Sequence, residues 1–161
     1  MKRVLLFCWI SFFSLLAYTQ DFVTLFMDEH ENDSNLTCVT ISPKMMEEIL
    51  HSDVEKNEDM LEVITSLKSM RILDSKVQGE VYFTTAKEVA EKNSKKFEEY
   101  LSYNDTDEDY HILVRRKKEN IIELAMLLLR NDVFVIISCT GKDIKPEFIS
   151  GLANSMKHKQ L

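Results

Sequence analysis

The fold is decided by residues 110–140, which read YHILVRRKKENIIELAMLLLRNDVFVIISCT. Three stretches within them are rich in β-branched and other apolar residues: Tyr110–Lys117, Ile121–Arg130 and Val133–Thr140. The joints between these stretches are only two or three residues long, and they are polar. Short polar joints between such stretches favour β-hairpins, so we predict a three-stranded antiparallel meander.

The second and third strands of this meander are apolar on both faces. Apolar side chains fill consecutive positions from 124 to 129 and again from 133 to 137. A strand that is apolar on both sides is buried on both sides. Either helices therefore cover both faces of the sheet, or a second subunit covers one of them.

Apolar spacing predicts the elements outside the meander. Apolar residues three or four positions apart predict helices, and β-branched runs predict strands. The expected helices are Asp21–Glu31, Pro43–Val54 with Ser42 as its cap, Asn57–Leu67, Thr85–Tyr103 and a last helix from Lys145-Pro146. The further expected strands are Leu36–Ile41, a short one at Arg71–Leu73 and a brief one at Val81–Phe83.

These elements together predict an α+β fold. We expect an antiparallel sheet of four or five strands, which includes the C-terminal meander, with helices packed mainly on one face. Residues 20–154 would form this single domain, and residues 155–161 a C-terminal tail.

The N-terminus has the three parts of a secretory signal peptide. A basic head, Lys2-Arg3, precedes an apolar run from Val4 to Leu16, and the small residues Ala17 and Thr19 suit a cleavage site. Residues 1–19 would be removed, which leaves Gln20 or Asp21 as the new N-terminus. The alternative is a membrane anchor, but a spanning helix needs about 20 apolar residues. We therefore expect an exported protein, periplasmic or extracellular, with no stable membrane anchor after cleavage.

The chain is acidic, with 20 Lys and Arg against 27 Asp and Glu and a formal charge of −7. Cleavage would remove Lys2 and Arg3, so the mature charge would be −9. An acidic surface repels phosphate backbones and anionic headgroups, so we expect no nucleic-acid or anionic-lipid partner.

Two cysteines remain after cleavage, Cys38 and Cys139, and each falls in an expected strand. Disulfides persist in exported proteins, so a bridge between the two is conceivable. The alternative is two buried free thiols, because free cysteine packs as a small apolar residue.

The usual catalytic and cofactor motifs are missing from the sequence. The three glycines are far apart, which argues against phosphate-binding loops, and there is no Gly-x-Ser-x-Gly. The histidines lack metal-ligand spacing. The acidic run 105–109 resembles the start of a calcium loop, but Tyr110 and Arg116 stand where the loop needs Gly and Glu. We expect no cofactor, no metal and no enzymatic activity.

A basic patch is formed by Arg115, Arg116, Lys117 and Lys118 at the end of the first predicted hairpin. Such a patch either solubilises a turn and blunts an edge strand or docks on an acidic protein or an envelope glycan. We keep it as a possible interaction patch.

The sequence resembles the domain-of-unknown-function family 4252, which comprises small exported Bacteroidetes proteins. The resemblance is carried by the signal peptide, the Phe22/Leu25/Phe26 helix, Thr37-Cys38-Val39-Thr40-Ile41-Ser42, and residues 115–129 joined to Val135-Ile136-Ile137-Ser138-Cys139-Thr140-Gly141. It implies no catalytic residue. It also implies a link to envelope-stress regulation, because members are expected near genes for extracytoplasmic sigma factors.

The doubly apolar sheet and the absence of an assembled active site favour a protein-interaction module in the cell envelope, which binds an unknown protein or itself. A small-ligand-binding domain with a pocket between sheet and helices is the first alternative. An enzyme of unrecognised type is the second.

Overall fold

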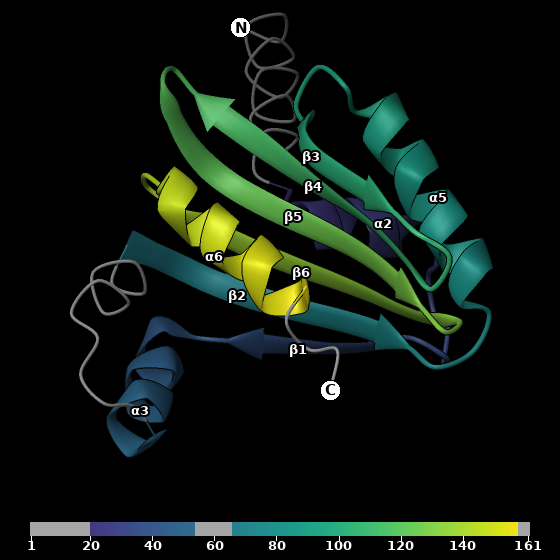
Figure 1. Cartoon of the computed structure of the whole chain (residues 1–161), viewed down its shortest axis with the longest axis horizontal. Helices are drawn as coiled ribbons and strands as arrows, with labels where there is room; N and C mark the ends of the chain where they lie inside the picture. Colours follow the sequence, from purple (N-terminus) through teal and green to yellow (C-terminus); the bar gives the residue numbers. More distant parts are fainter. Residues whose placement is uncertain (1–19, 54–65, 158–161) are drawn as a thin grey trace, which may run out of the picture.

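A six-stranded antiparallel sheet forms the centre of the molecule, with the strand order β1-β2-β6-β5-β4-β3 (Figure 1). Figure 1 is a computed structural model, in which residues 20–53 and 66–157 are described. The strands are β1 (Thr37–Ile41), β2 (Leu67–Ser75), β3 (Glu98–Asn104), β4 (Glu108–Lys117), β5 (Asn120–Arg130) and β6 (Val133–Gly141). The α+β class is therefore confirmed, but the predicted four or five strands were too few.

Helices lie on both faces of the sheet, so the prediction of helices mainly on one face was wrong. On one face lie α2 (Phe22–Asp28) and α5 (Gly79–Lys92), and on the other lies α6 (Pro146–Lys157), together with Met46 of α3 (Pro43–Asp53). The physical reason is the doubly apolar β5 and β6, whose two sets of side chains each need cover. No helix in the described part of the chain is long and apolar enough to cross a membrane.

The C-terminal meander β4-β5-β6 is confirmed, and its turns explain its register. Asn131 and Asp132 join Arg130 to its partner Val133, and both have positive φ, 51° and 60°. Two positive-φ residues in a two-residue loop are the type I′ turn that matches the twist of a hairpin. The β4–β5 hairpin also has a two-residue loop, in which Lys118 has a φ of 58°.

Residues 75–104 differ most from the prediction. The expected brief strand Val81–Phe83 lies inside α5, and the expected helix Thr85–Tyr103 is divided between α5 and β3. Tyr82, Phe83, Ala86 and Val89 are all buried at helical spacing, which places the helix earlier in the chain. Asn93 then ends α5, since its side-chain amide donates to the Val89 carbonyl oxygen.

Most other predicted elements are confirmed. These are the helices at the two ends of the domain and after Ser42, the strand before Pro43, and the short strand at Arg71–Leu73, which extends over the whole of β2. Helix α6 continues to Lys157, beyond the expected start of the tail. The predicted helix Asn57–Leu67 lies almost wholly outside the described residues.

Two apolar clusters fill the two sides of the sheet. The first is rich in aromatic rings and joins α2 and α5 to the sheet; Phe26, Tyr82 and Phe134 are its centre, with ring centroids 5.4 to 6.5 Å apart. The second is mostly aliphatic and includes Leu124, Met126 and Ile149. We call these sides the aromatic face and the aliphatic face.

Candidate functional site

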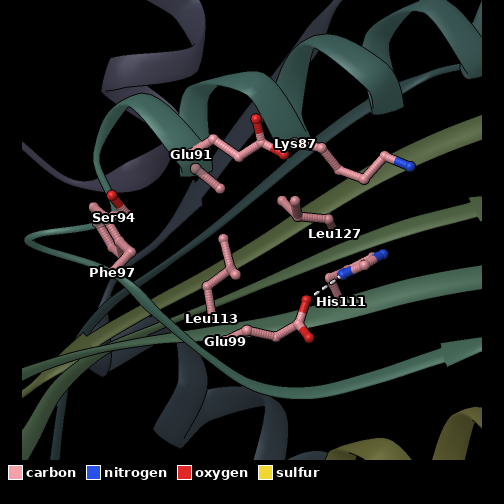
Figure 2. A pocket seen from close by; sticks show the side chains of 9 residues that line it. Lys87, Glu91, Ser94, Phe97, Glu99, His111, Leu113 and Leu127 are labelled. Atoms are coloured by element: carbon pink, nitrogen blue, oxygen red, sulfur yellow. Dashed lines mark hydrogen bonds and ion pairs between the residues drawn. The ribbon is translucent and has the colours of Figure 1, made fainter.

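A cleft of about 210 Å³ opens on the aromatic face between α5 and strands β3, β4 and β5 (Figure 2). Its floor is apolar: Ala90, Phe97, Leu113 and Leu127. Its rim is ionisable and polar: Lys87 and Glu91 from α5, Ser94 from the turn after α5, Glu99 from β3 and His111 from β4. We call this the α5 cleft.

The strand side of the rim is held by a hydrogen bond between His111 and Glu99. His111 Nδ1 lies 2.6 Å from Glu99 Oε2, and its Nε2 lies 3.4 Å from Asp109 Oδ1. Glu99 also accepts a hydrogen bond from the Ser102 hydroxyl. The hydrogen bond from His111 lowers the pKa of Glu99 below its usual value. These contacts fix the imidazole against the cleft wall.

The helix side of the rim is less constrained. Lys87 and Glu91 lie one turn apart on α5, and in Figure 2 the Lys87 ammonium extends away from the Glu91 carboxylate. The Lys87 ammonium lies 4.8 Å above the centre of the Phe83 ring. The cleft therefore offers an apolar floor with groups of both charges at its edge, which suits the apolar part of a small amphipathic molecule.

A buried carboxylate lies deeper on the same face. Glu123 on β5 has no exposed surface; Oε1 accepts from the Phe22 N–H at 2.7 Å and from the Ser138 hydroxyl at 3.3 Å, and Oε2 lies 2.6 Å from Arg115 Nη2. Burial raises the pKa of Glu123 to about 7, although each of these partners favours its charged form. The carboxylate thus joins the first residue of α2 to the sheet.

A second polar contact holds the same end of α2. Asp21 caps the helix by accepting from the Thr24 N–H at 2.8 Å, and Arg71 of β2 binds this carboxylate at 2.7 Å. Burial alone would raise the pKa of Asp21, but the hydrogen bonds from Thr24 and Arg71 outweigh it and lower the pKa. The sequence predicts the helix but not these partners, because only the strand register brings Arg71 and Glu123 to it.

The possible disulfide is a correction. Cys38 and Cys139 are free thiols on opposite faces of the sheet: Cys38 packs against the aromatic cluster, and Cys139 is buried in the aliphatic one. Strand β2 also lies between their two strands. Burial raises the pKa of the Cys139 thiol to about 12, which suits a packing residue and not a nucleophile.

The four residues of the predicted basic patch are not brought together. Arg115 points to the buried Glu123, whereas Arg116 pairs with Glu98 of β3 at 2.6 Å. Lys117 and Lys118 are exposed at the hairpin. Neighbouring strand residues point to opposite faces, and this alternation divides the patch.

The predicted acidic turn lies in the β3–β4 hairpin. Asp105 and Asp107 border a hollow of about 300 Å³ together with Glu80 and Asp132. Among the described residues, no three His, Cys, Asp or Glu side chains are grouped so as to hold a metal ion.

The two edges of the sheet differ in chemistry. Strand β3 carries Glu98 and Glu99, and its pairing register shifts between Glu99 and Leu101. Strand β1 reads TCVTI, has no acidic or basic side chain and pairs with β2 without a shift. Charges and bulges are the usual protection of edge strands against pairing with other chains. Thus β3 is protected, and β1 is not.

Backbone groups on the outer side of β1 are available for pairing within the described part of the chain. Among the described residues, β1 pairs with β2 alone. No backbone group of residues 37–41 forms a hydrogen bond with a described loop. Val39 at its centre is 49% exposed. The sequence predicts this strand, and the strand order makes it an edge.

One protein family has a sequence pattern that matches residues 29–152. The chain belongs to the DUF4252 family, a domain of unknown function. This confirms the resemblance found in the sequence. The DUF4252 match includes β1 and every residue that lines the α5 cleft, whereas α2 and its Asp21 cap precede it. No curated protein is significantly similar to this DUF4252 chain.

A solved structure from Pseudomonas aeruginosa, protein PA94, is also similar. It is described as a protein of unknown function and a candidate regulator, and it is 8% identical to this DUF4252 chain. The similarity covers 81% of this chain and 84% of that one, with a TM-score of 0.39. At this level of similarity, nothing about function follows for the DUF4252 chain.

Proposed function

We propose that this chain is an exported, non-catalytic domain of the cell envelope that binds a protein through the β1 edge of its sheet. The observation that supports it is the contrast between the edges: β3 is charged and bulged, whereas β1 is uncharged, regular and exposed. Adding a strand to an open edge is a recurring mode of protein recognition, in which backbone hydrogen bonds supply affinity.

Photo-crosslinking in cells that export the chain tests this proposal. A photoreactive amino acid at Val39 is expected to give a covalent protein adduct, because this position lies at the centre of β1. The same amino acid at Leu101 on β3 is the matched control, since that side chain is 39% exposed on the other edge. Equal adducts at both positions, or none at Val39, would contradict binding at β1.

A second candidate function is binding of a small ligand in the α5 cleft. The observation that favours it is the apolar floor below Lys87, Glu91 and His111. A cavity of this size accepts a short alkyl chain or one ring. Since the rim carries both charges, hexanoate and hexylamine are suitable probes. One of them is expected to raise the melting temperature, as any ligand that binds only the folded state does.

A cleft-filling variant completes this second test. Ala90→Leu places extra methyl groups above the floor and should abolish the shift. Ala153→Leu on α6 is the control for the same change on a helix outside the cleft. This candidate is wrong if neither probe raises the melting temperature of the unaltered chain. It is also wrong if the Ala90→Leu variant shows the same rise as the unaltered chain.

Export and regulation are parts of the proposal with their own tests. Mass spectrometry of the exported chain is expected to find Gln20 or Asp21 at its N-terminus, and removal of residues 2–19 should retain it in the cytoplasm. A role in envelope-stress control predicts that deleting the gene changes the output of an envelope-stress reporter. An unchanged reporter would contradict the role in envelope-stress control, but it would not contradict protein binding at β1.

A further inference from the structure

We infer that the partner at the β1 edge is a second copy of this chain, and that the two copies pair β1 with β1 in antiparallel orientation about Val39. This inference rests on the proposed function. It names the partner and the register, and it predicts one sheet that continues through both copies. Antiparallel pairing of identical edges produces a two-fold symmetric interface, which is the commonest arrangement of homodimers.

The sequence of β1 is compatible with pairing to itself. With Val39 on the two-fold axis, Val39 faces its own mate, Cys38 faces Thr40, and Thr37 faces Ile41. All of these side chains are small or β-branched, and such pairs suit facing positions in a sheet. No acidic or basic side chain lies in the strand, so none faces a like charge.

Charges on the neighbouring strand do not meet across the axis. Arg71 of β2 lies beside Thr40, and Asp74 lies beside Thr37. Because the two copies run in opposite directions, Arg71 aligns across the interface with the mate's Leu73. In the same way, Asp74 aligns with the mate's Met70. This matters because each copy from Gln20 onward has a formal charge of −9, and two copies of the same net charge repel each other.

An apolar row on the aliphatic face leads to this axis. The strand register aligns Val39, Ile72 and Ile137 directly across β1, β2 and β6. Val39 is 49% exposed, and the other two are only partly buried. Pairing would join this row to the same row of the mate and remove apolar surface from water at the centre of the interface.

The same row ends at the opposite edge in Leu101, which supplies a matched control. Leu101 pairs with Ile112, which aligns with Met126 and so with Ile137. The two end residues, Val39 and Leu101, thus share one face and one row and are 49% and 39% exposed. They differ in the edge on which they lie.

Disulfide trapping tests the register. In the chain from Gln20 to Leu161 with Cys38→Ser, the additional change Val39→Cys places two thiols opposite each other on the axis. Mild oxidation is expected to convert most of the chain to a covalent dimer on a non-reducing gel. Leu101→Cys in the same background should remain at least tenfold less cross-linked. Equal trapping at both positions, or none at Val39→Cys, would overturn the inference.

Native mass by light scattering provides the second measurement. The unaltered chain is expected to be a dimer, and Val39→Lys should weaken it at least tenfold by placing two ammonium groups on the axis, with Leu101→Lys unchanged. A folded unaltered chain that stays a monomer at 100 μM overturns the self-pairing. Photo-crosslinking at Val39 then separates the two ideas, because an adduct with a different protein preserves the proposed function, whereas no adduct removes it.

Discussion

The two faces of the sheet are covered in different ways. On the aromatic face, α2 and α5 bury a cluster of rings, and a buried carboxylate fastens α2 to the strands. On the aliphatic face, the centre is buried under Ile149 of α6, but Val39 and Val133 are 49% and 37% exposed. The first face fixes α2 and α5 on the sheet and opens at the α5 cleft, whereas the second is exposed toward the β1 edge, where we propose that binding occurs.

The largest expected effect is in the buried cluster of the aromatic face. Phe134→Ala removes a fully buried ring that contacts Phe26, Tyr82 and Phe83. Removing a buried aromatic side chain leaves a cavity, so the free energy of unfolding should fall by about 3–5 kcal/mol. Urea denaturation measures it. A loss below about 1 kcal/mol would mean that this face is less well packed than the ring contacts indicate.

The buried carboxylate should make stability depend on pH. The pKa of Glu123 is raised from 4.5 to about 7 in the folded chain. Its contribution is therefore fully present below pH 4.5 and is lost as the pH rises through about 7, by about 3 kcal/mol. Glu123→Gln should lack this loss, so the stability difference between the parent and the variant should change by that amount between pH 4.5 and 8 in urea titrations.

A pH-independent difference between the parent and Glu123→Gln would show that Arg115 and the Phe22 N–H fully offset the cost of burial. The pKa of Glu123 would then lie near its usual value. The anchor of α2 would still exist, but it would not sense pH.

Two glycines, one on the helix of each face, differ in how much space surrounds them. A Cβ on Gly79 would lie 2.2 Å from the Asp132 carbonyl oxygen, so Gly79→Ala should push α5 away from the β5–β6 turn at a cost of about 1–3 kcal/mol. A Cβ on Gly151 of α6 meets nothing within 4 Å, so Gly151→Ala should stabilise the helix by about 0.5–1 kcal/mol. Thermal unfolding compares the two. Changes of the same sign would contradict the tight contact at α5.

The smallest effect is expected on the exposed part of the aliphatic face. Val133→Thr exchanges one methyl group for a hydroxyl on a side chain that is 37% exposed. Surface changes of this kind usually alter stability by less than about 0.5 kcal/mol. A larger loss in urea denaturation would show that this part of the aliphatic face is covered in solution.

Much of the fold could be predicted where local signals agree. The meander was predictable because its joints are short and its strands are β-rich, and Asn131-Asp132 has the turn chemistry that the hairpin needs. The segment around β3 could not be predicted, because Glu98–Asn104 has no apolar alternation and becomes a strand only by pairing with β4. Tertiary pairing overrode local propensity there.

The candidate sites were less predictable than the fold. The α5 cleft brings together Lys87, Glu99 and His111 from three elements, and no spacing in the sequence links them. A pairing signal was present for Arg115 and Glu123, since they lie on consecutive predicted strands, but the register was needed to identify them as partners. The basic patch was overestimated because adjacent strand residues were counted as one surface.

The sequence by itself determined the α+β class, the antiparallel meander, the doubly apolar central strands and the acidic charge. These follow from local patterns and composition, which do not depend on which strands become neighbours. Only the tertiary structure decided that α5 and α6 cover opposite faces, that Cys38 and Cys139 lie apart, and that β1 is an unprotected edge. These depend on strand order, which arises from contacts between residues distant in the chain and therefore has no local signal.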